Sequence, residues 1–191
     1  MAGASRIAIF GGTFDPIHLG HIAMAEVAKE ACRLDLIHYI PCNLSPHKVE
    51  RDPTPAKYRL EMLKLATHDQ DWAVVNDIET RREGPSYSWM TAEAMREAMD
   101  DCRLFWIMGS DQWMALERWN QPQRLAEIVE FIVFHREEEP KTREGYRLWP
   151  MPAIHPANAT EIRMKIANGA KEHTWLHPDV SEYILSNNLY Q

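Results

Sequence analysis

The sequence lacks a long apolar segment and an excess of positive charge. No apolar run approaches the roughly 20 residues that a membrane-spanning helix needs, and the N-terminal residues lack the apolar core of a signal peptide. The chain of 191 residues has a formal net charge of −7. This balance disfavours a nucleic-acid-binding surface, which is usually basic, although it is compatible with a local basic pocket. We therefore expect a cytoplasmic protein without a membrane or nucleic-acid partner.

Cysteine is also scarce. Cys32, Cys42 and Cys102 are far apart, and no paired spacing suggests a disulfide framework or a zinc site. Internal repeats, low-complexity tracts and linkers are absent too. The length suits one domain with a proper core, so we expect a single domain over residues 1–191.

Short apolar segments alternate with helical patterns along the whole chain. Strands are predicted at residues 7–10, 35–40, 72–76, 104–108 and 131–134, with an edge strand at 147–151. Helices are predicted at residues 22–31, 54–67, 88–99, 123–128, 158–169 and 178–186, with a further helical stretch ending at 119. Residues 136–146 are charge-rich and predict a surface loop. The alternation predicts an α/β fold, a single doubly wound (Rossmann-like) domain with a mainly parallel sheet and sites at the carboxyl ends of its strands.

Two helix starts are predicted from capping residues. Thr54 is expected to cap the helix that begins with Pro55, because proline suits the first helical position. Asn158 and Glu161 form a capping-box pattern, and Gly169 is expected to end that helix.

Residues 10–21, Phe-Gly-Gly-Thr-Phe-Asp-Pro-Ile-His-Leu-Gly-His, form a strand-to-helix turn around which the chain is organised. A helix N-terminus has unpaired N–H groups and partial positive charge, which suit a phosphate. His18 and His21 would share one helical face and point at the same ligand. The alternative is a tight turn that needs glycine, with histidines merely near a cap. The turn matches neither the dinucleotide fingerprint nor the lysine-containing phosphate loop, so kinase-like transfer is disfavoured.

The residues of this turn resemble a motif of a known family. The run GGTFDPIHLGH resembles the nucleotide-binding motif of the nucleotidyltransferase superfamily in its Thr/His-x-Gly-His form. More narrowly, it resembles the bacterial nicotinate mononucleotide adenylyltransferases. The segments SPHK, GPSYS, IMGSDQWMALERW and NATEIR are similar, in this order, to further segments of that family, so the resemblance covers nearly the whole chain.

The resemblance implies a reaction of NAD biosynthesis. AMP would pass from ATP to the phosphate of nicotinate mononucleotide, which gives nicotinate adenine dinucleotide and pyrophosphate. The substrate phosphate would attack in line without a covalent enzyme intermediate, and Mg²⁺ would accompany ATP. Because a phosphate is already ionised near neutral pH, such a site needs positioned donors rather than a strong base.

The resemblance also assigns roles to residues. The catalytic group would be His18, His21, Lys48 and Arg163. ATP would contact Gly11, Gly12, Thr13, Phe14, His18, Gly20, His21, Gly109, Asp111, Asn158, Thr160 and Arg163. The mononucleotide would contact Thr13, His47, Lys48, Ser86, Tyr87, Ser88, Trp119 and Arg136.

Some of these assignments have plain structural alternatives. Asp111 could be a helix N-cap, the segment with His47 and Lys48 could be a solvated loop, and Trp119 could be a core residue. Asn158 stands where the family usually has serine, and Ser88 stands where it usually has threonine. Neither difference overturns the match, but both bear on the discrimination between the acid and the amide acceptor. Residues 136–146 also lack the Pro-Gly turn that often follows the family's arginine.

Other functions remain open at this point. A sister transferase could accept nicotinamide mononucleotide or another phosphorylated group such as phosphopantetheine. A nucleotide-binding regulator without activity is disfavoured, because the residues that resemble the motifs are intact. An RNA-binding module is disfavoured by the acidic balance. The oligomeric state is open, a homo-oligomer included.

Overall fold

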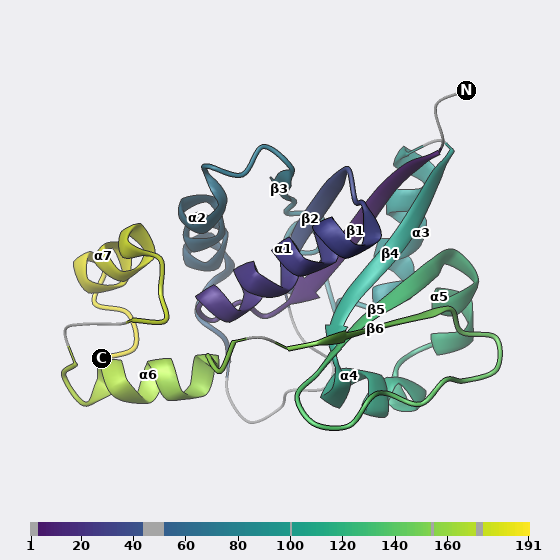
Figure 1. Cartoon of the computed structure of the whole chain (residues 1–191). Coiled ribbons are helices and arrows are strands. Elements are labelled where there is room, and N and C mark those ends of the chain that lie inside the picture. Colours follow the sequence, from purple (N-terminus) through teal and green to yellow (C-terminus); the bar gives the residue numbers. More distant parts are fainter. Residues whose placement is uncertain (1–3, 44–51, 100, 154, 171–173) are drawn as a thin grey trace.

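A six-stranded parallel sheet forms the centre of the computed structural model (Figure 1), which describes residues 4–43, 52–99, 101–153, 155–170 and 174–191. The strand order is β3-β2-β1-β4-β5-β6, and every neighbouring pair is parallel. The strands are β1 (Ser5–Gly12), β2 (Leu36–Pro41), β3 (Ala73–Val75), β4 (Cys102–Gly109), β5 (Val129–His135) and β6 (Leu148–Pro152). The prediction of a doubly wound, mainly parallel sheet is confirmed.

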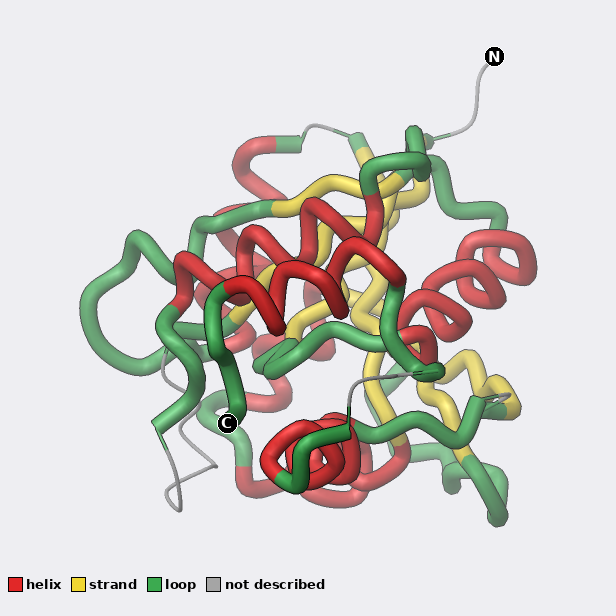
Figure 2. Tube along the Cα trace, turned by 90° about the vertical axis from the view of Figure 1, so that its left-hand side faces the viewer, coloured by secondary structure: helices red, strands yellow, loops and turns green. Residues whose placement is uncertain are grey.

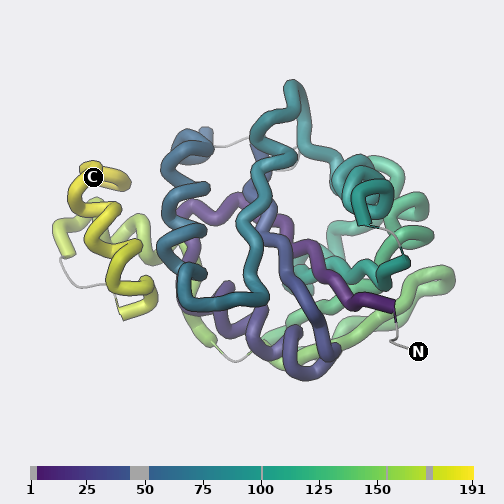
Figure 3. Tube along the Cα trace, turned by 90° about the horizontal axis from the view of Figure 1, so that it is seen from above, coloured from purple at the N-terminus to yellow at the C-terminus, as the bar shows by residue number. Residues whose placement is uncertain are grey.

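Helices cover both faces of this sheet (Figure 2). They are α1 (Leu19–Cys32), α2 (Ala56–Thr67), α3 (Ser88–Ala98), α4 (Ser110–Ala115), α5 (Pro122–Ile128), α6 (Ala159–Ala167) and α7 (Pro178–Ser186), with a 3₁₀ turn η1 (Leu116–Arg118). Successive strand residues point to opposite faces, so Phe10 packs with α1, α2, α6 and α7, whereas Ile9 packs with α3, α4 and α5. Seen from above, the two C-terminal helices lie beside α2, away from α3 (Figure 3).

The strand order reverses between β1 and β4. The chain winds outward from β1 through β2 to β3, and then returns to β4 on the other side of β1. At such a switch point the two neighbouring loops diverge and leave a crevice beyond the carboxyl ends of the strands. The fold therefore places Gly12 and Gly109, the last residues of β1 and β4, beside a ligand crevice.

One predicted helix start is wrong by a small shift. Helix α2 begins at Ala56, and its N-cap is Pro55 rather than Thr54. The backbone N–H of Thr54 donates to the carboxylate of Asp15 (3.2 Å), and its carbonyl accepts from Arg59 (2.7 Å). These two bonds to side chains, of which the one to Asp15 is long-range, hold Thr54 outside the helix.

The other cap and the edge strand are as predicted. The Asn158 side chain accepts from the backbone N–H of Glu161 (2.8 Å), and Gly169 ends the helix with a φ of 79°. Strand β6, which contains Pro150, lies at the edge of the sheet, where a missing donor does little harm. Among the residues that the structure describes, no helix is both long and apolar enough to cross a membrane.

Candidate active site

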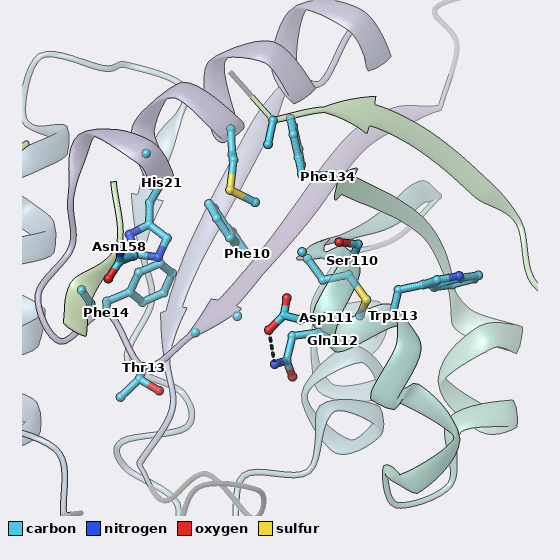
Figure 4. Close-up of a pocket in the computed structure, with 18 of the residues that line it drawn as sticks. Phe10, Thr13, Phe14, His21, Ser110, Asp111, Gln112, Trp113, Phe134 and Asn158 are labelled. Atoms are coloured by element: carbon cyan, nitrogen blue, oxygen red, sulfur yellow. Dashed lines mark hydrogen bonds between the residues drawn. The ribbon is translucent and has the colours of Figure 1, made fainter. Parts of the chain in front are cut away.

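A large cleft lies at the carboxyl ends of the strands, with a volume of about 1760 Å³. Ligand pockets for one small molecule usually enclose roughly 300–1,000 Å³, so this cleft has room for two nucleotides. Every predicted site residue within the described part of the chain lines it. His47 and Lys48 lie outside the described residues. In Figure 4, His21 and Asn158 lie on one side of the cleft and Asp111 on the other.

The floor of the cleft is bare backbone at the end of β1. A Cβ atom on Gly11 would lie 3.0 Å from Cζ2 of Trp106 on β4, and one on Gly12 would lie 3.1 Å from the ring of Phe14. Any larger residue would have to displace an aromatic ring. Glycine thus lets these rings approach the backbone closely, and without side chains the backbone of residues 11 and 12 is accessible to a ligand.

His18 and His21 stack on each other at the start of α1. His18 is the N-cap residue, and its backbone N–H donates to Nδ1 of His21 (3.3 Å). The ring centroids are 3.7 Å apart and the rings are within 22° of parallel. The prediction that the two side chains share one face is confirmed, although His18 precedes the helix. Gly20 makes room for this pair, since a Cβ there would lie 3.0 Å from Nδ1 of His18.

The surroundings of His18 disfavour its charged form. Burial, and next the nearby His155, lower the pKa of His18 to about 4, and Arg136 acts in the same direction. His18 is therefore neutral near pH 7 in a cleft without ligand. An anion close to these three groups would favour the protonated ring, because opposite charges stabilise each other. His155 was missed by the sequence analysis, because nothing in its segment resembles a motif.

The turn at residues 13–15 is held by side chains from distant parts of the chain. Arg59, which is 1% exposed, donates to the carbonyl of Thr13 (2.8 Å). Arg163 donates to the carbonyl of Asp15 (2.7 Å), and the Tyr190 hydroxyl donates to the carboxylate of Asp15 (2.6 Å). The sequence analysis missed Arg59 and Tyr190, since no local pattern marks a residue whose partner is far along the chain.

A second helix start faces the same cleft. Asn158 caps α6, and Thr160 and Arg163 follow on the first turns. The guanidinium of Arg163 also contacts the Thr160 hydroxyl (3.3 Å). The N-termini of α1 and α6 thus both border the cleft, and each provides N–H groups and partial positive charge for an anion.

Across the cleft, Asp111 follows β4. Gly109 is the N-cap of α4, so the alternative in which Asp111 caps this helix is wrong. Asp111 lies in the first turn, is exposed, and accepts from the Gln112 amide (2.9 Å). A Cβ on Gly109 would lie 2.6 Å from the Asp111 carboxylate, so a larger residue there would have to turn this exposed side chain away. The carboxylate is free to accept from hydroxyl donors of a ligand.

The third group of site residues comes from the segments after β3, η1 and β5. Ser86 is buried, Tyr87 is the N-cap of α3, and Ser88 is the first residue of that helix. Trp119 is half-buried and packs edge-on against Trp106, with ring centroids 6.3 Å apart. Trp119 therefore forms part of a wall of the cleft rather than the interior of the core. The exposed Arg136 follows β5 and also borders the cleft.

Comparison with known proteins identifies the family. A family model described as cytidylyltransferase-like matches residues 9–165. Two proteins, from Thermomicrobium roseum and Hydrogenobaculum sp., each bear the name "Probable nicotinate-nucleotide adenylyltransferase". The first is 35% identical over 98% of this chain and 92% of its own length, and the second is 37% identical over 96% and 97%. The chain belongs to the nicotinate-nucleotide adenylyltransferases.

Solved structures share the fold of this nicotinate-nucleotide adenylyltransferase family member. The Plasmodium falciparum nicotinic acid mononucleotide adenylyltransferase complexed with NaAD has a TM-score of 0.79 and 18% identity, with 97% of each chain covered. A putative nicotinate-nucleotide adenylyltransferase from Vibrio parahaemolyticus has a TM-score of 0.72 over 95% of this chain and 99% of its own, also at 18% identity. At such identities the likeness concerns the fold alone.

Proposed function

We propose that this protein transfers AMP from ATP to nicotinate mononucleotide and releases nicotinate adenine dinucleotide and pyrophosphate. The observation that carries the proposal is the convergence, in one cleft, of the stacked His18 and His21, the start of α6 and the segment at residues 84–88. Relatives also support the proposal, because proteins named "Probable nicotinate-nucleotide adenylyltransferase" match almost the full length of the chain.

The side of the cleft formed by α1 and α6 is suited to the triphosphate. The histidine pair and Arg163 offer hydrogen-bond donors, and the exposed backbone at Gly11 and Gly12 allows close approach. On the opposite side, Asp111 is suited to accept from the ribose hydroxyls of the adenosine. ATP would then lie across the switch point between β1 and β4.

The remaining space is suited to the mononucleotide. Trp119 offers an aromatic face to the pyridine ring, and the backbone N–H groups of Tyr87 and Ser88 offer donors to its carboxylate. A helix N-terminus favours an anion, and these residues stand at the start of α3. Arg136 would contact a phosphate.

In the proposed step, a phosphate oxygen of the mononucleotide attacks the α-phosphorus of ATP in line. The new P–O bond forms while the bond from the α-phosphorus to the bridging oxygen breaks, and that oxygen leaves with the pyrophosphate. The protein holds the reacting groups and stabilises the charge that grows on the phosphate oxygens. His18 and His21 serve as donors to those oxygens, and Arg163 and Thr160 hold the leaving pyrophosphate.

Mg²⁺ would enter with ATP. In the described part of the chain, the one group of three candidate metal ligands that lie close together is His68, His177 and Asp179, which do not line the cleft. An ion in the cleft would thus be held mainly by phosphate oxygens and water, with Asp111 as an available carboxylate, which is the usual way for Mg²⁺. Its chemistry would be to neutralise part of the triphosphate charge.

Pyrophosphate release tests the proposal. The purified protein is incubated with ATP and Mg²⁺, and with nicotinate mononucleotide, nicotinamide mononucleotide or phosphopantetheine in parallel. We expect fast release with nicotinate mononucleotide, and a product with the mass of nicotinate adenine dinucleotide. Faster release with another acceptor would assign the protein to a sister reaction. ATP binding without release for any acceptor would indicate a regulator.

A further inference from the structure

Glu79 is a buried acidic residue that the proposed reaction does not use. It follows β3, is only 4% exposed and lines the cleft. Its carboxylate accepts a hydrogen bond from the Thr91 hydroxyl (2.7 Å) and another from the Ser86 hydroxyl. Burying a carboxylate costs free energy unless its oxygens accept hydrogen bonds, so the Glu79 side chain needs both hydroxyl donors at these positions.

The contacts of Glu79 continue into a closed ring of hydrogen bonds. The Ser86 hydroxyl oxygen accepts from the backbone N–H of Asn43 (3.1 Å), and the Asn43 amide donates to the carbonyl of Arg82 (3.3 Å). The Arg82 guanidinium in turn contacts the hydroxyl of Thr91 (3.4 Å), which leads back to Glu79. The ring thereby joins the segment after β2, the turn after β3 and helix α3.

This ring determines what Ser86 can offer to a ligand. Its hydroxyl hydrogen is directed at Glu79, and its oxygen accepts from Asn43. The Ser86 hydroxyl therefore makes its hydrogen bonds within the protein. The segment at residues 84–88 presents its backbone N–H groups to the cleft, at positions that the ring of hydrogen bonds fixes. Thr91 anchors the same ring to α3, at whose start Tyr87 and Ser88 stand.

We propose that Glu79 is a positioning residue for the acceptor, because it fixes the segment at residues 84–88 in the arrangement that receives the carboxylate of the pyridine ring. Glu79 thereby sets the preference for the acid over the amide acceptor. The proposal rests on the proposed function and concerns one side of the cleft only. The triphosphate side shares no member of the ring.

The direction of the effect separates positioning from simple charge repulsion. A negative charge near an anionic acceptor repels it, so loss of the charge alone would lower the KM for nicotinate mononucleotide. Loss of the arrangement would raise that KM. Removing the Glu79 charge while keeping its size therefore gives opposite results for the two explanations.

The variant Glu79→Gln provides this test. Glutamine has one acceptor oxygen where the carboxylate has two, so it cannot accept from both hydroxyls in the same way. We expect the KM for nicotinate mononucleotide to rise about tenfold, as for the loss of a hydrogen bond to a charged group, with an unchanged KM for ATP. The ratio of kcat/KM for nicotinate over nicotinamide mononucleotide should fall.

Two further variants complete the design. Asp77→Asn makes the same chemical change at a nearby carboxylate. Asp77 pairs with Arg81 on the surface (2.8 Å) and does not line the cleft, so the KM for nicotinate mononucleotide and the KM for ATP should both stay unchanged. Thr91→Val removes one hydroxyl from the ring of hydrogen bonds, at a residue that does not line the cleft. It should raise the KM for nicotinate mononucleotide and leave the KM for ATP unchanged. If Glu79→Gln does not fold, as judged by thermal unfolding, Thr91→Val carries the test.

Each outcome has a separate meaning. An unchanged or lower KM for nicotinate mononucleotide in these variants overturns the positioning role. An equal rise in the KM for ATP also overturns it, because it indicates a general loosening of the fold. If the wild-type protein forms no product with nicotinate mononucleotide, the proposed function itself fails, and this proposal falls with it.

Discussion

The two sides of the cleft are built in different ways. On the triphosphate side, the main chain itself faces the ligand at two helix starts, and Arg59 and Arg163 hold its carbonyls. On the acceptor side, the ligand meets loop segments whose positions depend on side chains such as Glu79 and Ser86. A backbone held by the buried Arg59 and the half-buried Arg163 tolerates little change. The comparison therefore indicates that changes on the triphosphate side affect the reaction itself, whereas changes on the acceptor side affect which molecule enters.

The largest effect is expected at His21. The change His21→Ala should lower kcat by roughly 10²–10³-fold, the usual result of deleting one donor that stabilises the transition state. The KM for nicotinate mononucleotide should change much less. Steady-state kinetics at saturating ATP provides the measurement, and a near-normal kcat would show that the histidine pair is structural.

His18 should make folding stability depend on pH. Its pKa is about 4 in the folded protein, below the usual 6.5, so the unfolded chain binds a proton that the folded chain does not. The stability is fully present above pH 6.5 and declines as the pH falls toward 4. Between pH 7.5 and 4.5 this group should remove roughly 2–3 kcal/mol from the free energy of unfolding.

The matched variant is His18→Asn, because asparagine retains the ability to cap α1. Urea unfolding at the two pH values should show a smaller loss for the variant than for the wild-type protein. Equal losses would mean that other groups cause the acid sensitivity.

On the acceptor side, Trp119→Ala should weaken binding of the mononucleotide. Stacking of a base on an aromatic ring is worth roughly 1–3 kcal/mol by alanine substitution. The KM for nicotinate mononucleotide should therefore rise by about fivefold or more, and the KM for ATP should stay unchanged. Trp72→Ala is the control, because Trp72 packs with Lys29 and the core on the α1 face of the sheet and does not line the cleft. A similar rise in both variants would place the pyridine ring elsewhere.

The smallest effect concerns the cap of α6. Asn158→Ala should lower stability by about 1 kcal/mol, and the Tm by roughly 2–4 °C, because the N–H of Glu161 loses its acceptor. Asn158→Ser restores the residue that is usual in the family and keeps an acceptor, so its Tm should stay near the wild-type value. Thermal unfolding followed by circular dichroism distinguishes the two, and an unchanged Tm for the alanine variant would argue against a capping role.

Local chemistry explains why most of the fold could be predicted. The apolar run of β4, the glycines of the first turn and the Asn158 cap each act within a few residues, so the sequence shows them directly. The motif residues from Gly11 to Arg163 were found for a related reason, because their spacing along the chain carries the family resemblance.

Long-range contacts explain what could not be predicted. The local pattern of Thr54 suits a helix cap, yet its N–H bonds to Asp15 and Pro55 is the N-cap. His155 influences His18 from a segment without any recognisable pattern. No local pattern marks Glu79, and its burial becomes visible only once β3 and α3 are packed. Each of these depends on the tertiary structure rather than on neighbouring residues.

The hydrogen bond from Tyr190 to Asp15 connects residues that are 175 positions apart. A ribosome makes the nucleotide-binding turn well before Tyr190, so the turn first exists without this bond. Of the three side chains that hold this turn, Tyr190 is thus the last to be synthesised, and the phosphate side of the cleft is fully supported only once it is in place.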